Sequence, residues 1–192
     1  PGFVEDAARV VAWTFENASR FGSDHSRIFL MGHSAGAYIA AMVALDERYL
    51  AKQGYSPRRL AGWIGLSGPY DFLPLQSRRL KKIFGDPAPR ATQPVDFVSA
   101  TAPPVLLITG DADKRVIPRN THRLEVRLRE AGVPVRKLIY PDVGHGRTVA
   151  AFSNLGNRLP IISEVQRFIV DAASGNFARI EAHHQEPREE SR

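Results

Sequence analysis

The stretch Ser26-Arg-Ile-Phe-Leu-Met-Gly-His-Ser-Ala-Gly-Ala-Tyr-Ile-Ala-Ala-Met-Val-Ala-Leu45 decides the fold. Its first part, Ser26–Met31, is a short apolar run closed by glycine, which predicts a buried strand. The residues from Ala35 to Tyr49 are rich in Ala, Leu and Met nearly all round, which predicts a deeply buried helix. The turn between them, Gly32-His33-Ser34-Ala35-Gly36, fits the pattern Gly-x-Ser-x-Gly, and we call this turn the elbow. A serine on such a turn has a strained backbone and exposes its hydroxyl above the sheet.

Three further apolar runs predict strands, at Leu60–Ser67, Pro103–Gly110 and Val135–Tyr140. None of the four runs alternates apolar with polar residues over its whole length, which indicates strands covered on both faces, as in a parallel sheet. Helical patterns precede, separate or follow them, at residues 4–18, 118–131 and 158–173. This alternation predicts an α/β fold with at least four parallel strands flanked by helices.

The chain has 192 residues, enough for one domain with a core, which we place at residues 1–175. Within it, the proline-rich segment 70–102 is predicted to be an irregular excursion of the kind that forms lids or pocket walls. Residues 176–192 are polar and are predicted to be a disordered tail. We interpret the pair His183-His184 as part of that solvated tail and not as a metal site.

Composition excludes several classes of protein. Cysteine is absent, so no thiolate nucleophile or cysteine-ligated metal exists. The net charge is +6, but the basic residues are scattered and lack interleaved aromatics, so we expect no nucleic-acid partner. The longest apolar run is well short of the about 20 residues that a membrane span needs. No leader follows Pro1, so we expect a cytoplasmic location unless a targeting region is missing from this chain; homo-oligomerisation stays open.

A serine nucleophile needs a base, and the base needs an orienting carboxylate. His145, flanked by glycines just past the fourth apolar run, is well placed to be the base. Asp111 and Asp113, both just past the third run, are the candidates for the carboxylate. The chain order Ser, Asp, His is that of the α/β-hydrolases. The amide of Ala35, directly after the serine, is the candidate oxyanion donor.

The chain resembles α/β-hydrolases of the bacterial carboxylesterase and lipase type, with feruloyl-esterase-like and kynurenine-formamidase-like relatives. Four segments carry the resemblance: GHSAG at 32–36, SGPYDF at 67–72, GDADKRVIP at 110–118 and GVPVRKLIYPDVGHG at 132–146. The resemblance implies that Asp113, three positions after the strand-ending glycine, is the acid, although the following proline is displaced by one position. It also assigns Tyr70, Asp71, Phe72, Leu73 and Leu75 to a pocket wall, and we add His33 of the elbow to the substrate-binding residues.

One departure from the family pattern concerns the N-terminal side. Such hydrolases begin with further strands and a glycine-rich HGG-type loop that supplies a second oxyanion-hole amide. No HGG occurs here, and the sequence begins in the helix before the elbow strand. We therefore expect the chain to be N-terminally truncated, with the N-terminal strands absent, and to correspond to the C-terminal two-thirds of a hydrolase.

These observations predict a serine hydrolase that cleaves carboxylic esters through Ser34, Asp113 and His145 and an acyl-enzyme. The expected partner is a small-molecule ester, with no metal or organic cofactor. Two alternatives stay open: an amidase or formamidase with the same triad, and a noncatalytic hydrolase-like binding protein.

Overall fold

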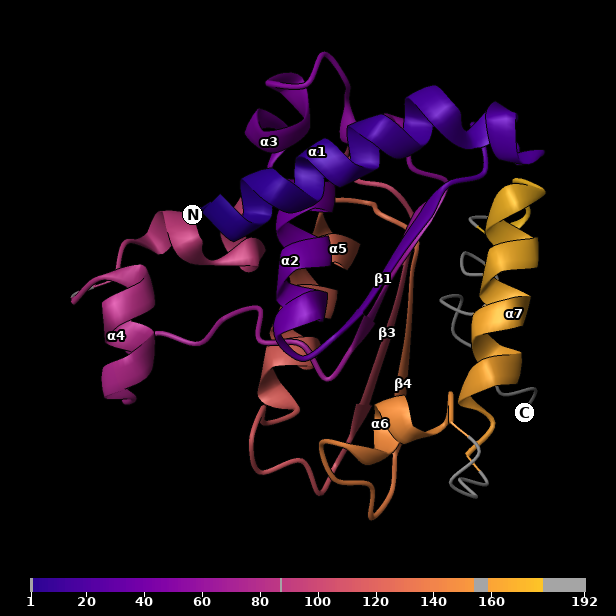
Figure 1. Cartoon of the computed structure of the whole chain (residues 1–192). Helices are drawn as coiled ribbons and strands as arrows, with labels where there is room; N and C mark the ends of the chain where they lie inside the picture. The colour runs from indigo at the N-terminus through magenta and orange to yellow at the C-terminus, as the bar shows by residue number, and fades with distance from the viewer. Residues whose placement is uncertain (1, 87, 154–158, 178–192) are drawn as a thin grey trace.

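The computed structural model describes residues 2–86, 88–153 and 159–177. Its centre is a parallel sheet of four strands in the order β1-β2-β3-β4 (Figure 1). The strands are β1 (Phe29–His33), β2 (Gly62–Leu66), β3 (Val105–Gly110) and β4 (Val135–Tyr140). In the register of the sheet, Phe29 is opposite Gly62, Trp63 is opposite Val105, and Val105 is opposite Val135. The predicted α/β class and all four predicted strands are confirmed.

Seven α-helices and four 3₁₀ helices precede, connect or follow the strands in the described part of the chain. The α-helices are α1 (Gly2–Asn17), α2 (Ala35–Leu45), α3 (Glu47–Ala51), α4 (Arg78–Phe84), α5 (Arg119–Glu130), α6 (Arg147–Ala150) and α7 (Ile161–Ala173). The 3₁₀ helices are η1 (Ala18–Phe21), η2 (Pro57–Arg59), η3 (Arg90–Thr92) and η4 (Pro94–Phe97).

The helix predicted from Ala35 to Tyr49 is in fact two helices, so that prediction was wrong in its C-terminal third. Asp46 has extended backbone angles, φ −90° and ψ 98°, and its side chain accepts a hydrogen bond from the backbone N–H of Arg48. An aspartate in this position caps the start of a new helix, α3, because it satisfies a free amide of the first turn. The apolar pattern runs across this break and therefore conceals it.

Alternate residues of the central strands face opposite layers of helices. Trp63, Val105 and Leu107 belong to the apolar cluster that includes α1, α2 and α5. Ile64, Leu66, Leu106 and Ile108 belong to the cluster that includes α7. Figure 1 shows α2 and α7 on opposite sides of the sheet. Because both faces of β2 and β3 are covered, these strands are buried along their whole length, as the sequence predicts.

The outer strands of the described sheet, β1 and β4, are only partly buried, contrary to the expectation that all four are covered on both faces. Met31 of β1 is 50% exposed, and Ile139 of β4 is 45% exposed. A strand at the edge of a sheet has a neighbour on one side alone, so its side chains are less enclosed.

The predicted irregular excursion, residues 70–102, contains one α-helix, α4, and the 3₁₀ helices η3 and η4.

Phe177, which we predicted to lie in a disordered tail, is instead buried. Its ring lies 4.8 Å from that of Phe168 and under the guanidinium of Arg136. The rest of the predicted tail, residues 178–192 with His183-His184, lies outside the described residues, as do residues 154–158.

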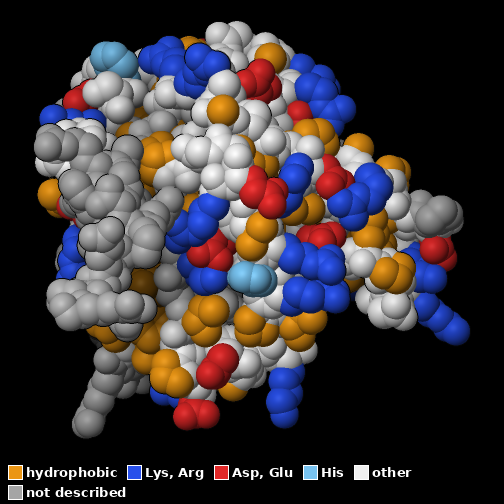
Figure 2. All heavy atoms as spheres, turned by 180° about the vertical axis from the view of Figure 1, so that it is seen from behind, with side chains coloured by type: hydrophobic (Ala, Val, Ile, Leu, Met, Phe, Trp, Pro, Cys, Tyr) orange, Lys and Arg blue, Asp and Glu red, His pale blue; other side chains and the backbone are white. Residues whose placement is uncertain are grey.

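Charges are distributed over the surface in both signs. Figure 2 shows the back of the molecule, where Lys and Arg side chains are interspersed with Asp and Glu. None of the helices that the structure describes is long and apolar enough to cross a membrane.

Candidate active site

The serine of the predicted elbow sits on a strained turn between β1 and α2. Ser34 has φ 56° and ψ −118°, a conformation that costs free energy for any residue other than glycine. Hydrogen bonds fix it on both sides: its N–H donates to the carbonyl of Leu66 at 2.8 Å, and its carbonyl accepts from the N–H of Tyr38 at 3.1 Å. The elbow is thus held by the neighbouring strand and by the first turn of the helix.

The two glycines of the elbow differ in what they permit. A Cβ added at Gly32 would lie 2.2 Å from the backbone carbon and oxygen of Gly36, so only glycine fits there. A Cβ at Gly36 would meet nothing within 4 Å. Glycine therefore permits the close backbone approach at Gly32, while at Gly36 a methyl group has room.

Ser34, His145 and Asp113 form one hydrogen-bonded row. The Nε2 atom of His145 lies 2.8 Å from the Oγ of Ser34, and its Nδ1 atom lies 2.8 Å from Oδ2 of Asp113. The three residues follow β1, β4 and β3, so the parallel sheet brings them together at the carboxyl ends of its strands, toward the lower part of Figure 1. In this arrangement a serine hydroxyl can lose its proton to an imidazole that a carboxylate orients.

The environment of Asp113 favours its ionised form. The side chain is fully buried, and burial alone raises the pKa of a carboxyl group. Hydrogen bonds outweigh burial, because Oδ1 accepts from the backbone N–H groups of Val116 and Arg115, each at 2.9 Å, and Oδ2 faces His145. As a result the pKa of Asp113 lies below its usual value of 3.8.

The other candidate aspartate, Asp111, has a different contact. Its Oδ1 accepts a hydrogen bond from the backbone N–H of Asp142 at 2.7 Å. Asp142 has φ 55°, so this contact holds a left-handed turn in the loop that carries His145. Nearby, a Cβ on Gly110 would lie 1.9 Å from the carbonyl oxygen of Val143, which requires glycine where β3 meets that loop. Asp111 and Gly110 thus support the loop, a role that the sequence alone did not reveal.

An apolar cavity of about 810 Å³ opens beside Ser34 and Ala35. Of the residues predicted to form a pocket wall, Asp71, Phe72, Leu73 and Leu75 line it. Apolar side chains of other elements contribute much of the remaining lining: Phe3, Tyr38, Ile39, Leu80, Ile83, Phe84, Val116 and Ile117. Polar and charged side chains also line it: Gln76, Ser77, Arg115, Arg119 and Asn120. Leu80, Ile83 and Phe84 come from α4, whose apolar side the sequence analysis did not identify.

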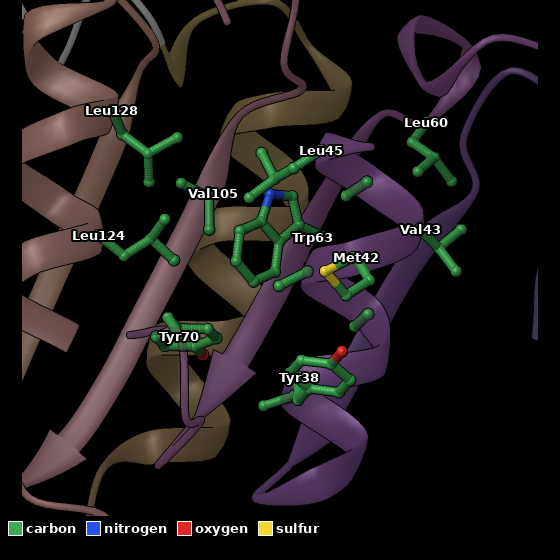
Figure 3. Packing of buried hydrophobic residues seen from close by; sticks show 14 of the residues in the cluster. Tyr38, Met42, Val43, Leu45, Leu60, Trp63, Tyr70, Val105, Leu124 and Leu128 are labelled. Carbon is green, nitrogen blue, oxygen red and sulfur yellow. The ribbon is translucent and has the colours of Figure 1, made fainter. Parts of the chain in front are cut away.

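Two residues assigned to substrate binding lie elsewhere. Tyr70 is fully buried in the core, where its ring packs against Trp63 at 6.1 Å, as Figure 3 shows. Gly65 leaves room for it, since a Cβ there would lie 2.0 Å from the tyrosine hydroxyl. His33 does not line the cavity; its Nε2 lies 2.9 Å from the carbonyl oxygen of His145. The prediction for Tyr70 came from the family resemblance, and the prediction for His33 came from its place beside Ser34 in the elbow.

Side-chain amides hold the cavity wall in place. Oδ1 of Asn120, in the first turn of α5, accepts from the backbone N–H groups of Tyr70 at 3.0 Å and Asp71 at 2.9 Å. Oε1 of Gln93 accepts from the N–H of Phe72 at 2.8 Å. Buried backbone amides must be paired, so these two side chains allow an irregular segment to lie against the core. The sequence offers no periodic signal for such contacts.

Ala35 begins α2, where the first N–H groups have no partner within the helix. A helix N-terminus of this kind attracts negative charge, so the Ala35 amide is suitably located for an oxyanion donor.

Among the described residues, no group of three His, Cys, Asp or Glu side chains is arranged to hold a metal ion.

A parallel α/β sheet with a serine elbow after one strand, and an aspartate and a histidine after two others, defines the α/β-hydrolase class. Solved structures agree on the fold. The chain matches a truncated carbohydrate esterase from gut microbiota with a TM-score of 0.75 at 19% identity, covering 91% of this chain and 69% of that one. It matches the carboxylesterase Cest-2923 of Lactobacillus plantarum with a TM-score of 0.72 at 18% identity, covering 91% and 68%.

The chain belongs to the BD-FAE family, whose model matches residues 1–128. Its homologues are carboxylic ester hydrolases. It is 27% identical to the esterase LipQ of Mycobacterium tuberculosis, over 79% of this chain and 40% of LipQ. It is 29% identical to the isoprenylcysteine alpha-carbonyl methylesterase ICME of Arabidopsis thaliana, over 74% of this chain and 38% of ICME. The chain thus spans about 40% of the length of such relatives.

Proposed function

We propose that this chain carries the catalytic residues of a serine hydrolase acting on carboxylic esters. The observation that carries the proposal is the hydrogen-bonded row from Ser34 through His145 to Asp113, with both imidazole nitrogens at 2.8 Å from their partners. Membership of an esterase family supports the same reaction. The names of relatives, such as an esterase and a methylesterase, point to esters as the substrate class.

In the proposed mechanism, Ser34 Oγ attacks the ester carbonyl while His145 Nε2 takes its proton. The imidazolium that forms keeps its Nδ1–H directed at the ionised carboxylate of Asp113, which stabilises the charge. The N–H of Ala35 stabilises the tetrahedral oxyanion; one such donor is typically worth about 3 kcal/mol. His145 then protonates the leaving alcohol, an acyl-enzyme forms on Ser34, and a water activated by the same imidazole hydrolyses it.

The cavity beside Ser34 supports a preference for apolar substituents. Aromatic and aliphatic side chains form most of its walls, and its volume of about 810 Å³ exceeds what a methyl or ethyl group fills. Burying each additional methylene contributes about 0.8 kcal/mol. We therefore expect kcat/KM to rise from acetyl to hexanoyl esters of p-nitrophenol.

The test is labelling of the full-length protein with a fluorophosphonate probe, together with hydrolysis of a matched p-nitrophenyl ester and p-nitroanilide of the same acyl group. We expect labelling that disappears in Ser34→Ala and persists in Ser77→Ala, a control at a second serine that lines the same cavity. Ester turnover should exceed anilide turnover. The opposite preference would make the protein an amidase, and absence of labelling in the wild type would indicate a noncatalytic binding protein.

A further inference from the structure

The main-chain carbonyl of His145 is bound by two side chains, one distant in sequence and one three residues further along the chain. Nε2 of His33, the last residue of β1, lies 2.9 Å from this oxygen. The hydroxyl of Thr148, in α6, donates to the same oxygen at 3.1 Å. A carbonyl oxygen has two lone pairs, so both bonds can form at once.

Thr148 is in turn fixed by Ser67, at the carboxyl end of β2. Their hydroxyl oxygens are 3.1 Å apart, and both residues are fully buried. Because the Thr148 hydroxyl gives its proton to the His145 carbonyl, Ser67 must be the donor in this pair. The resulting direction is Ser67 to Thr148 to His145. Ser67 ends the second predicted strand run, and the proposed mechanism does not use it.

Ser67 holds this position at a conformational cost. Its φ is 49°, in the left-handed region that glycine adopts readily and serine rarely. The backbone is held there by a hydrogen bond from its N–H to the carbonyl of Ile108 at 2.8 Å. A glycine would meet the backbone requirement without strain, but it would lack the hydroxyl that Thr148 receives.

A bond from a threonine to the carbonyl three residues earlier is common in helical turns, so the contact between Thr148 and His145 alone could be local turn geometry. The long-range partners argue otherwise. Ser67 is 81 positions from Thr148, and His33 is 112 positions from His145. Two other strands thus converge on one peptide group of the loop that carries the imidazole.

His145 needs this support because glycines flank it on both sides. Glycine leaves the backbone free to rotate, and rotation would carry the imidazole away from the 2.8 Å contact with Ser34. We propose that His33, Thr148 and Ser67 are positioning residues. They hold the His145 carbonyl in place, His33 and Thr148 by direct hydrogen bonds and Ser67 through Thr148, so that the imidazole stays within reach of Ser34 while it gains and loses a proton. This inference rests on the proposed function, in which His145 is the base.

The test compares Thr148→Val, which keeps the shape and removes the hydroxyl, with Thr148→Ser, which keeps the hydroxyl. Active sites are counted by fluorophosphonate titration, so that kcat refers to folded molecules. We expect Thr148→Val to lower kcat between about tenfold and a hundredfold with little change in KM, the effect of a slightly misplaced catalytic group. Thr148→Ser should retain kcat near the wild-type value. The low-field proton NMR signal of the His145 Nδ1–H should broaden or vanish in Thr148→Val alone.

A second pair of variants covers the case in which Thr148→Val does not fold. His33→Gln keeps an amide donor of similar reach and should retain kcat, whereas His33→Leu should lose it to the same extent as Thr148→Val. If Ser34→Ala is inactive and both Thr148→Val and His33→Leu keep wild-type kcat and the NMR signal, the proposed positioning role is refuted while the proposed function stands. If Ser34→Ala hydrolyses esters as well as the wild type does, both the proposed function and the positioning role that depends on it are refuted.

Discussion

Asp111 and Asp113 bind different parts of the loop that carries His145. Asp113 faces the imidazole, whereas Asp111 accepts a hydrogen bond from the backbone of Asp142. An asparagine at position 111 still offers a carbonyl oxygen to that N–H. An asparagine at position 113 can turn its NH₂ group toward the imidazole and favour the wrong tautomer.

We therefore expect Asp113→Asn to lower kcat on a short p-nitrophenyl ester by a factor on the order of 10³ to 10⁴. Asp111→Asn, measured in parallel, should change kcat little. A greater loss in Asp111→Asn than in Asp113→Asn would reverse the assignment of the acid.

His33 makes stability depend on pH. Burial lowers the pKa of His33 below 6.5, although the bond to the His145 carbonyl acts in the opposite direction. Near pH 6.5 the unfolded chain takes up a proton that the folded chain does not bind, so the free energy of unfolding falls as the pH drops below that value. His33→Gln removes this titration and keeps a donor. Urea unfolding at several pH values between about 5 and 7 should show that the free energy of unfolding depends less on pH in the variant than in the wild type. The same pH dependence in both proteins would contradict the lowered pKa of His33.

At the scale of elements, the junction of β1 and α2 depends on one glycine and not on the other. A methyl group at Gly32 would overlap the backbone carbon and oxygen of Gly36, and these two atoms cannot move without displacing α2. A methyl group at Gly36 has open space, and alanine is more favourable than glycine in a helix by about 1 kcal/mol. Thermal unfolding should show a large loss of Tm in Gly32→Ala, or no folded protein, and an unchanged or higher Tm in Gly36→Ala. Equal destabilisation by both substitutions would refute this reading of the elbow.

The strands and the elbow could be predicted because each depends on residues close together in sequence. Burial on both faces leaves a continuous apolar run in β2 and β3, and the elbow has fixed glycine spacing. The break at Asp46 could not be predicted, because the apolar pattern continues through it and a single side-chain bond to Arg48 starts the second helix. The core position of Tyr70 depends on Trp63 and on the space above Gly65, which are tertiary features.

At the scale of the whole molecule, the candidate site uses the carboxyl ends of all four strands. Ser34 follows β1, Ser67 follows β2, and Asp113 and His145 lie in the loops after β3 and β4. The serine, the base and the acid could be proposed from chain order and loop position, since parallel strands end at one edge. The contacts of His33 with the His145 carbonyl and of Ser67 with Thr148 could not, because they join residues that only the folded sheet brings together.

The most direct test of the central claim is kcat for ester hydrolysis by full-length Ser34→Ala, His145→Ala and the double variant, on a short p-nitrophenyl ester. If the serine and the imidazole act as one unit, each single substitution removes nearly all of the activity that the double substitution removes. We expect equally low kcat values for the two single variants and the double variant. Retention of more than about a tenth of wild-type kcat by Ser34→Ala, or losses that multiply in the double variant, would contradict this expectation.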